Sequence, residues 1–401
     1  MYFNFILYYY IMSNLPSKFI QFGCWNNLNQ KGCLRNVMNT LSSYLRNRDK
    51  SPDKPPEFLV VSGDNYYPEK ETINDVKKKT IHKNLLEEGF DLLPSNLPIY
   101  MMLGNHDLET NNRKTSLYID DTPEKNCQII QSEWASKYTN VHYNFFATKK
   151  LAHGTLLLMI DTSVYTKDAP NYLPCFNKFF EISSTERHFD TIDSLREYQD
   201  YLILQAINEY NEPLKNIILV GHHPITGIKL KKDNYVLLDD IPYFKETLKR
   251  IYTLPFSNLP KFYYLCSDLH MYQQGTIKLS FQPNVQEPME KEPMEKMEKE
   301  PMEIIQYIVG TGGAELDYIP TPIPDRDIPT HIQEDDAFRY TMNEFIIKCG
   351  FLECSITGPD SIKFTFIPIP DIGGKFNRKT KRRTKRRTKR RIKRRTRNYR
   401  V

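Results

Sequence analysis

Polar side chains that could bind metal ions or transfer protons follow four short apolar runs of this chain. The four segments read VVSGDNYYP, MMLGNHDLE, LVGHHPI and YLCSDLHMYQ. Oxygen and imidazole donors suit hard or borderline metal ions. The residue types therefore indicate a metal centre, for which the candidates are Asp64, Tyr67, Asn105, His106, His222, Asp268 and His270.

These candidates lie where predicted strands end. Short apolar runs alternate with helical patterns, which is typical of a sheet covered by crossover helices. Side chains just beyond the strand ends of an α/β sheet meet in one crevice, so we expect the candidates to converge. A helix with one apolar face is predicted from the spacing of Ile192, Leu195, Tyr198, Leu202 and Ala206. The predicted strands are residues 18–23, 58–62, 99–103, 155–160, 216–220, 261–266 and 304–309.

The order of these segments resembles that of the calcineurin-like metallophosphoesterases, most closely the purple acid phosphatases of the tartrate-resistant type. GDNYY, GNHD, GHHP, the DLH segment and IVGTGG occur in the family's order across residues 18–368, and IDTS at 160–163 also matches. The resemblance implies an α/β fold, a four-layer αββα sandwich of two mixed β-sheets flanked by helices. It also implies a metal-dependent phosphoesterase that hydrolyses phosphomonoesters.

Two metal ions form the centre that the resemblance implies. Asp64 would bridge both ions, because a carboxylate has two oxygens that can each hold a cation. Tyr67 and His270 would bind the first ion, and Asn105 and His222 would bind the second. A phenolate ligand favours ferric iron, so iron paired with iron, zinc or manganese is expected.

The resemblance also implies how the reaction proceeds. A metal-bound hydroxide would attack phosphorus in line, while His106 would donate a proton to the leaving alkoxide. Asp107, the next residue, is assigned to the catalytic set with His106. The phosphorylated substrate is expected to contact His223, Asn27 and Trp25, which line the predicted crevice.

Three positions depart from the family's pattern. FGCWNN offers Cys24 where the family has an Asp, and Asp268 stands where the family has the first His of a His-x-His pair. We expect both to be metal ligands, Cys24 as a softer thiolate. The loop after GHHPI lacks an additional His that family members use near the substrate, and Lys231 or Lys232 are its expected substitutes.

Charge is distributed unevenly along the chain. Residues 375–401 hold 17 of the 55 Lys and Arg residues and no acid, so the rest carries 38 basic against 49 acidic side chains. The Lys-Arg-Arg-Thr repeats predict a disordered basic tail that binds nucleic acid or another polyanion. Residues 287–303 predict a solvated, low-complexity insertion. We expect an N-terminal extension over 1–17 with Met12 as an alternative start, a phosphoesterase domain over 18–368 and a tail over 369–401.

Seven dispersed cysteines predict mostly reduced thiols in a reducing compartment; they are at positions 24, 33, 127, 175, 266, 349 and 354. The apolar start lacks the basic region and cleavage site of a signal peptide, and no window reaches transmembrane length. These features favour the cytoplasm or nucleus. Richness in Asn, Ile, Lys and Tyr is typical of an AT-rich genome, such as that of a large DNA virus or a protist.

Two other hypotheses stay open. The altered positions 24 and 268 are consistent with a catalytically degenerate phosphoesterase that acts as a scaffold. The basic tail is consistent with a nucleic-acid-binding or packaging protein built on a phosphoesterase body. The sequence does not identify the substrate, because variable loops recognise the leaving group.

Overall fold

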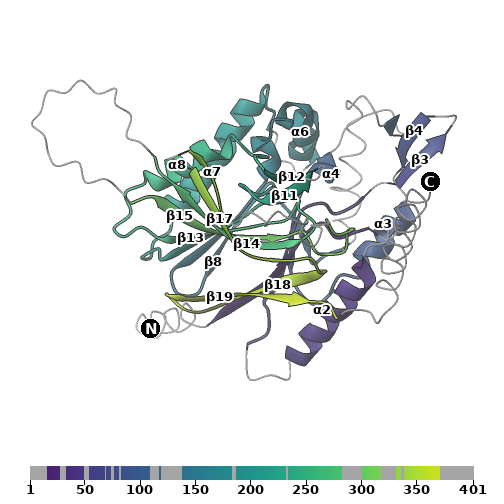
Figure 1. Ribbon diagram of the computed structural model, residues 1–401, viewed down its shortest axis with the longest axis horizontal. Helices are drawn as coiled ribbons and strands as arrows, with labels where there is room; N and C mark the ends of the chain where they lie inside the picture. Colours follow the sequence, from purple (N-terminus) through teal and green to yellow (C-terminus); the bar gives the residue numbers. More distant parts are fainter. Residues whose placement is uncertain are drawn as a thin grey trace, which may run out of the picture. The chain divides into compact units, whose positions relative to one another are not determined.

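The apolar runs of the chain form the parallel strands of two β-sheets (Figure 1). In the computed structural model, β1 (Ser17–Phe22), β2 (Phe58–Ser62) and β5 (Ile99–Met102) pair in parallel in one sheet. The second sheet contains the parallel strands β9 (Thr155–Ile160), β10 (Asn216–Val220), β13 (Lys261–Cys266) and β15 (Met302–Val309). All seven predicted strands are confirmed, with small shifts at their ends.

The structure describes most of the chain in separate ranges, and all the sheets belong to one unit that ends at Pro368. No helix among the described residues is both long and apolar enough to cross a membrane. The described ranges are 16–27, 33–48, 54–67, 69–73, 76–80, 83–108, 117–118, 138–182, 187–231, 234–281, 300–317, 331–335 and 338–370.

Further strands extend both sheets beyond their parallel centres; β7 pairs with β5 in parallel, and the others pair antiparallel. The first sheet has the order β19-β18-β1-β2-β5-β7, and the second has the order β16-β17-β14-β15-β13-β10-β9-β8. The sequence prediction missed these added strands, which are β7 (Val141–Tyr143), β18 (Gly350–Gly358), β19 (Ser361–Pro368), β8 (Phe146–Leu151), β14 (Tyr272–Leu279), β16 (His331–Asp335) and β17 (Phe338–Ile346).

The remaining strands of the described residues form two small sheets. A hairpin joins β11 (Ile228–Lys231) to β12 (Asn234–Leu237) in antiparallel register. The other small sheet contains β3 (Glu69–Ile73), β4 (Val76–Thr80) and β6 (Leu117–Tyr118). The β11–β12 hairpin follows GHHPI directly, so it lies close in sequence to a predicted ligand.

The two large sheets pack face to face. Phe19 and Val60 of the first sheet share one buried apolar cluster with Leu157, Ile218 and Leu265 of the second. Alternate residues of the same strands point away from this cluster, because successive side chains of a strand lie on opposite faces. Both faces of each sheet's parallel centre are covered, and most residues of their strands are apolar.

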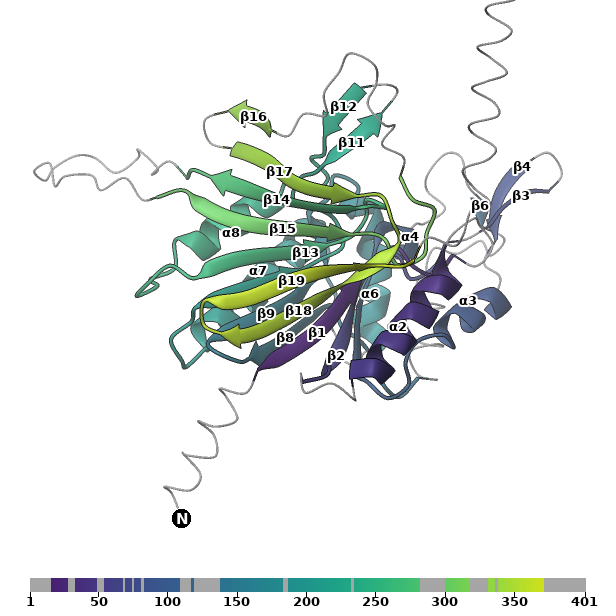
Figure 2. The ribbon, with the colours of Figure 1, turned by 60° about the horizontal axis from the view of Figure 1, so that its bottom comes forward.

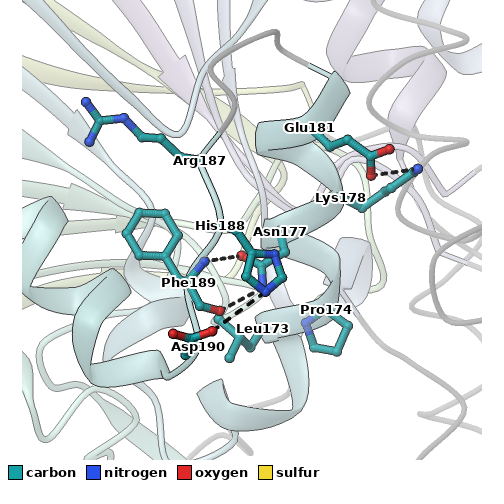
Figure 3. Close-up of a pocket in the computed structure, with 9 residues that line it drawn as sticks. All are labelled: Leu173, Pro174, Asn177, Lys178, Glu181, Arg187, His188, Phe189 and Asp190. Atoms are coloured by element: carbon teal, nitrogen blue, oxygen red, sulfur yellow. Dashed lines mark hydrogen bonds and ion pairs between the residues drawn. The ribbon is translucent and has the colours of Figure 1, made fainter.

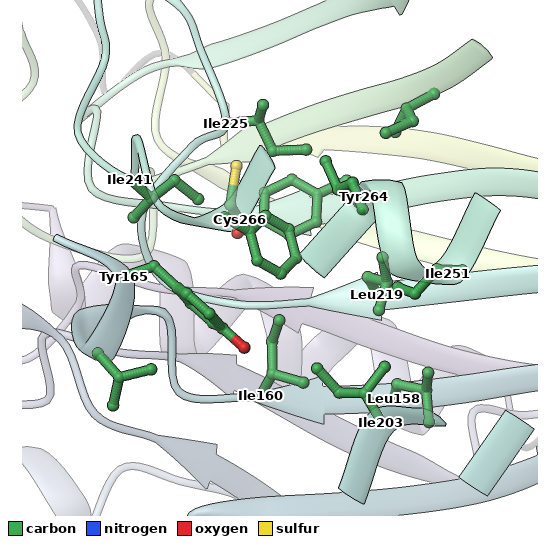
Figure 4. Packing of buried hydrophobic residues seen from close by; sticks show 14 of the residues in the cluster. Leu158, Ile160, Tyr165, Ile203, Leu219, Ile225, Ile241, Ile251, Tyr264 and Cys266 are labelled. Carbon is green, nitrogen blue, oxygen red and sulfur yellow. The ribbon is translucent and has the colours of Figure 1, made fainter. Parts of the chain in front are cut away.

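Helices cover the outer faces of both sheets, which confirms the predicted mixed α/β fold. Helices α6 (Leu173–Ile182), α7 (Ile192–Asn208) and α8 (Phe244–Tyr252) share an apolar cluster with the second sheet, where Ile203 and Ile251 lie near Leu158 and Leu219 (Figure 4). Helices α2 (Leu34–Arg48) and α3 (Lys83–Phe90) lie side by side near β1 and β2 (Figure 2). Two short 3-10 helices, η2 (Thr162–Tyr165) and η3 (Ala169–Tyr172), follow β9.

Helix α7 is present as predicted, but its most buried face is turned from the predicted one. Ile192 and Leu195 are buried as predicted. In the later turns of the helix, Gln199, Ile203 and Ile207 are buried in place of Leu202 and Ala206. Gln199 can be buried because its side chain pairs with the main chain of Asp161 in both directions. An apolar periodicity does not detect a buried polar residue of this kind.

The expectation of mostly reduced cysteines is wrong in part. A disulfide joins Cys33, next to the start of α2, to Cys349 in the turn before β18. Cys175 also takes part in a disulfide. Cys24, Cys266 and Cys354 are buried thiols. Disulfide partners cannot be deduced from cysteine positions alone.

Several predicted segments lie wholly or partly outside the described residues. Of the N-terminal extension over 1–17, residues 1–15 lie outside and Ser17 already belongs to β1. Residues 287–299 of the predicted insertion also lie outside, but its last residues belong to β15, which begins at Met302. Residues 371–401, which include the basic repeats, lie outside as well.

Removing the Cys33–Cys349 disulfide is expected to destabilise the fold. The bond closes a loop of 316 residues, and loss of a link across so long a loop costs about 3–5 kcal/mol of unfolding free energy. Denaturant unfolding of a Cys33→Ser, Cys349→Ser double variant measures this loss. Cys354→Ser is the control, because it replaces a buried cysteine that forms no disulfide. An unchanged midpoint in the double variant would show that the link does not stabilise the native state.

Candidate metal centre

The carboxyl ends of the parallel strands bring the predicted donors of both sheets together. Side chains just beyond the strand ends lie 2.9–3.8 Å from one another, both within one sheet and between the two sheets. The predicted ligands are Cys24 after β1, Asp64 and Tyr67 after β2, Asn105 at the start of the short helix α4 (Asn105–Leu108) after β5, His222 after β10, and Asp268 and His270 after β13.

Three of these positions have backbone conformations that side-chain-bearing residues rarely adopt. The φ angles of Cys24, Asp64 and Asp268 are 51°, 53° and 53°. Among the described residues, His153 is the other non-glycine residue with positive φ. Such conformations cost about 1–3 kcal/mol each and persist where surrounding contacts enforce them, which is common at functional sites. The strain therefore falls on candidate ligands of the centre.

Asp64 lies at the middle of the centre, and its carboxylate oxygen Oδ2 faces one group of donors. The Tyr67 hydroxyl donates to Oδ2 at 2.9 Å, and the Cys24 sulfur lies 3.8 Å from the same oxygen. The Tyr67 oxygen is also 3.0 Å from Nε2 of His270. Phenol, thiol and imidazole donors thus gather on this side of the carboxylate.

The other oxygen, Oδ1 of Asp64, faces a second group of donors. Nε2 of His222 lies 3.3 Å from Oδ1, 3.0 Å from the amide oxygen of Asn105 and 3.6 Å from a carboxylate oxygen of Asp268. The main-chain N–H of His106 donates to Oδ1 at 3.1 Å. Asp64 itself is almost fully buried, so each of its oxygens is presented to donors rather than to bulk water.

The two imidazoles are oriented by contacts of their other ring nitrogens. Nδ1 of His222 donates to the main-chain oxygen of Ser62 at 2.8 Å, and Nδ1 of His270 donates to the main-chain oxygen of Glu315 at 2.7 Å. Both rings therefore present Nε2 to the centre. Metal-binding histidines are usually held in this way.

Asp107 holds two loops together beneath the centre. Its carboxylate accepts hydrogen bonds from the main chain of Asn65 and Gly104 and from the side chain of Asn65. Asn65 in turn accepts a bond from the indole N–H of Trp25 at 3.1 Å. These bonds indicate a positioning role for Asp107, and its place in the catalytic set with His106 stays a prediction.

The residues predicted to contact the substrate are buried. Trp25 is fully buried against Phe22 and Phe90, and its indole N–H supports Asn65. Substrate contact by Trp25 stays a prediction. Asn27 is 4% exposed and His223 is 5% exposed. His223 lies with His222 and Asp268 in a group whose donor atoms are all within 4.8 Å of one another.

Two residues near the centre were missed as site residues by the sequence prediction. The hydroxyl oxygen of Thr162 accepts bonds from the main-chain N–H groups of His222 and His223. Asp317 accepts a bond from the main-chain N–H of His270 at 3.0 Å. Thr162 lies just after β9, so the strand-end rule could have found it, whereas Asp317 lies well beyond the end of β15.

The charges of the centre favour a bound cation. Burial disfavours the charged form of His222, but the negative charges of Asp64 and Asp268 outweigh it and raise its pKa to about 10. Although burial raises the pKa of Asp268, the bond and charge of His222 hold it well below its usual value. Burial, then Asp64 and Asp268, raises the pKa of the Cys24 thiol. Ionised Asp64, Asp268 and Cys24 would therefore need positive charge close to them in the buried centre.

A surface pocket among the described residues lies elsewhere and shares no residue with the centre. It has a volume of about 790 Å³ beside α6 and the segment 187–190 (Figure 3). Asn177 bonds to the main chain of Phe189 there, and Lys178 pairs with Glu181. Because convergent buried donors indicate function better than pocket size, we assign the chemistry to the metal centre.

The chain belongs to the calcineurin-like phosphoesterase family. The family model matches residues 17–251, which is more than half of the chain. The matched residues include Asp64, Asn105 and His222 and end before Asp268 and His270. The family predicted from the motifs is thereby confirmed, and no curated protein sequence shows a significant match.

Several solved structures are similar to this chain, and two of them are described here. One is a Plasmodium protein described as GAP50, the anchor in the inner membrane complex, at 12% identity and a TM-score of 0.48, covering 89% of this chain and 85% of that protein. The other is the purple acid phosphatase PPD1 from yellow lupin (Lupinus luteus) seeds, at 11% identity and a TM-score of 0.47, covering 90% of this chain and 53% of that protein.

Replacing Gly104 by Ala is expected to disrupt the centre. The added Cβ would lie 2.3 Å from Oδ1 and 2.4 Å from the main-chain nitrogen of Asp64, so the two loops must move apart. Overpacking of this kind costs about 1–3 kcal/mol, and metal affinity should fall with it.

Gly358→Ala is the matched control, because its Cβ would meet nothing closer than 3.5 Å. Denaturant midpoints and zinc affinity, measured by competition with a chromophoric chelator, compare the two variants. Equal values for both variants would contradict the assigned contact between Gly104 and Asp64.

Proposed function

We propose that this protein is a phosphoesterase that hydrolyses phosphomonoesters with two metal ions. The observation that carries the proposal is the position of Asp64, whose two carboxylate oxygens face two separate groups of donors. A single bound ion would need only one such group. Membership of the calcineurin-like phosphoesterase family supports the reaction class.

The donor groups fit two ions of different character. Cys24, Tyr67 and His270 would hold the first ion on the Oδ2 side of Asp64, through sulfur, phenol and imidazole. Asn105, His222 and Asp268 would hold the second ion on the Oδ1 side, through oxygen and imidazole. Cys24 of the first set, His222 of the second and Asp64 between them each place one ligand atom within 4.8 Å of the others. The two sets therefore lie side by side around Asp64, which supports a pair of ions that share this carboxylate.

When bound, the metal ions would activate a water molecule and neutralise the negative charge of the phosphoryl group. His106 would donate a proton from its ring to the leaving oxygen. Its main-chain bond to Asp64 fixes its position beside the centre, and its ring lies 4.8 Å from the ring of Tyr67. Asp107 would keep this loop in place through Asn65 and Gly104.

The ligand types narrow the choice of metals. A phenol ligand favours ferric iron at the first position, whereas the Cys24 sulfur favours softer ions such as zinc or ferrous iron over manganese. The second position has oxygen and imidazole donors, which accept iron, zinc or manganese. We therefore propose iron or zinc at the first position and iron, zinc or manganese at the second.

A degenerate centre that serves as a scaffold is the alternative, and the substitutions at Cys24 and Asp268 motivate it. Both side chains nevertheless lie within the donor groups rather than outside them. Binding of nucleic acid through residues 375–401 is compatible with either function. Loss of salt-dependent DNA binding in a variant with neutralised tail residues would support that role.

Hydrolysis of an aryl phosphate by the full-length protein is expected to require added iron, zinc or manganese. His106→Ala should reduce kcat by about 10²–10⁴, which is the usual contribution of a general acid. His188→Ala is the control, because His188 is exposed in the pocket beside α6. A folded, metal-loaded protein without turnover would contradict the proposed activity, and equal rates for the two variants would contradict the role of His106.

Cobalt(II) is expected to bind the thiolate of Cys24. The wild-type protein should then show a sulfur-to-cobalt charge-transfer band in the near ultraviolet, which Cys24→Asp should abolish while retaining bound cobalt. Cys354→Ala is the control, since Cys354 is also a buried thiol but lies between the two sheets. A band that persists in Cys24→Asp would exclude Cys24 as its source.

A further inference from the structure

Lys229 on the β11–β12 hairpin lies at the edge of the metal centre. Its ammonium nitrogen is 3.3 Å from a carboxylate oxygen of Asp317, and its side chain is 39% exposed. The sequence had suggested Lys231 or Lys232 for a cation in this loop. Lys232 and the side chain of Lys231 lie outside the described part of the structure. The described cation of the hairpin near the centre is therefore Lys229.

Two buried glutamines fix the main chain that carries Lys229. Gln306 on β15 accepts a bond from Ile225 and donates to Thr226. Gln273 on β14 accepts a bond from the main chain of Ile228 at 2.9 Å and donates to its oxygen at 3.0 Å. Paired bonds of this kind leave the base of the hairpin little freedom. The position of Lys229 is thus set by the second sheet.

Asp317 connects Lys229 to a candidate ligand. The main-chain N–H of His270 donates to the Asp317 oxygen that contacts Lys229, and the main-chain N–H of Asp317 donates to the oxygen of His270. The Lys229 charge also reaches two nearby acids. Burial raises the pKa of Asp240 to about 6 and the Lys229 charge opposes that rise, while Lys229 adds to the larger effect of His222, which lowers the pKa of Asp268 against its burial. The ammonium group therefore lies beside the centre, with part of its surface open to solvent.

We propose that Lys229 binds a nonbridging oxygen of the substrate's phosphoryl group and so favours doubly charged phosphomonoesters over singly charged diesters. This inference rests on the proposed function. A partly exposed ammonium held by one carboxylate retains donors for an incoming oxyanion. A charge-assisted bond strengthens with the negative charge on the acceptor, so the dianion gains more than the monoanion.

The alternative role for Lys229 is structural, since it could serve only to hold Asp317 and through it His270. The two roles differ in what a substitution changes. Loss of a structural lysine would release metal, whereas loss of a phosphate-binding lysine would leave the metal content unchanged and weaken phosphate binding. Lys167 provides a control, because it too pairs with an aspartate, Asp239, at 3.4 Å and belongs to neither donor group of the centre, although its side chain is more exposed.

The experiment measures inorganic phosphate binding by calorimetry and bound metal by elemental analysis in full-length, metal-loaded protein. Lys229→Ala is expected to bind phosphate about tenfold more weakly, the loss of one charge-assisted bond, with unchanged metal content. Lys229→Arg should restore binding to within about threefold of the wild-type value. KM for an aryl phosphate should rise more than KM for a bis-aryl diester.

Phosphate affinity of Lys229→Ala equal to that of Lys167→Ala would overturn the proposal, and so would loss of metal in Lys229→Ala. In either case a wild-type protein that binds metal and hydrolyses the aryl phosphate would leave the proposed function standing. A wild-type protein that does neither would reject the proposed function and this inference together.

Discussion

The buried carboxylate of Asp64 is the interaction on which the rest of the structure depends. One oxygen faces Tyr67 and Cys24, and the other faces His222. These donors follow strands in two different sheets, so they meet only because the sheets pack face to face with their parallel strand ends at the same edge. The apolar cluster between the sheets thereby determines the distances within the centre.

The cost of burying acids explains why a cation belongs there. Asp64 is almost fully buried, and Asp268 carries a second carboxylate beside it. Ionised groups removed from water need opposite charge or several hydrogen bonds. Asp107 obtains such bonds from Asn65 and Gly104. Asp64 accepts bonds from Tyr67 and His106, but for opposite charge it shares the imidazole of His222 with Asp268. Metal ions would supply the remaining positive charge and also the reactivity.

Sequence patterns were sufficient for the parallel strands and for the convergence of the donors, because short, continuous apolar runs that end at polar residues are typical of buried parallel strands. They were insufficient for β14, β17 and β18, whose polar and apolar residues mix. The burial of Trp25 and the position of Lys229 were also not predicted, since both depend on contacts between residues far apart in the chain. Trp25 supports Asn65, and the glutamines of β14 and β15 fix the hairpin. The Cys33–Cys349 disulfide links residues far apart in the chain, and no local pattern indicates it.

The most direct test of the central claim is the number of metal ions bound per chain. Elemental analysis of the full-length protein after reconstitution with zinc should give two ions, and Asp64→Ala should lose both, because each ion depends on one oxygen of that carboxylate. Asn105→Ala should lose only one, since Asn105 belongs to the Oδ1 group alone. One ion or none in the wild-type protein, or two ions retained in Asp64→Ala, would contradict the assignment of Asp64 as the shared ligand.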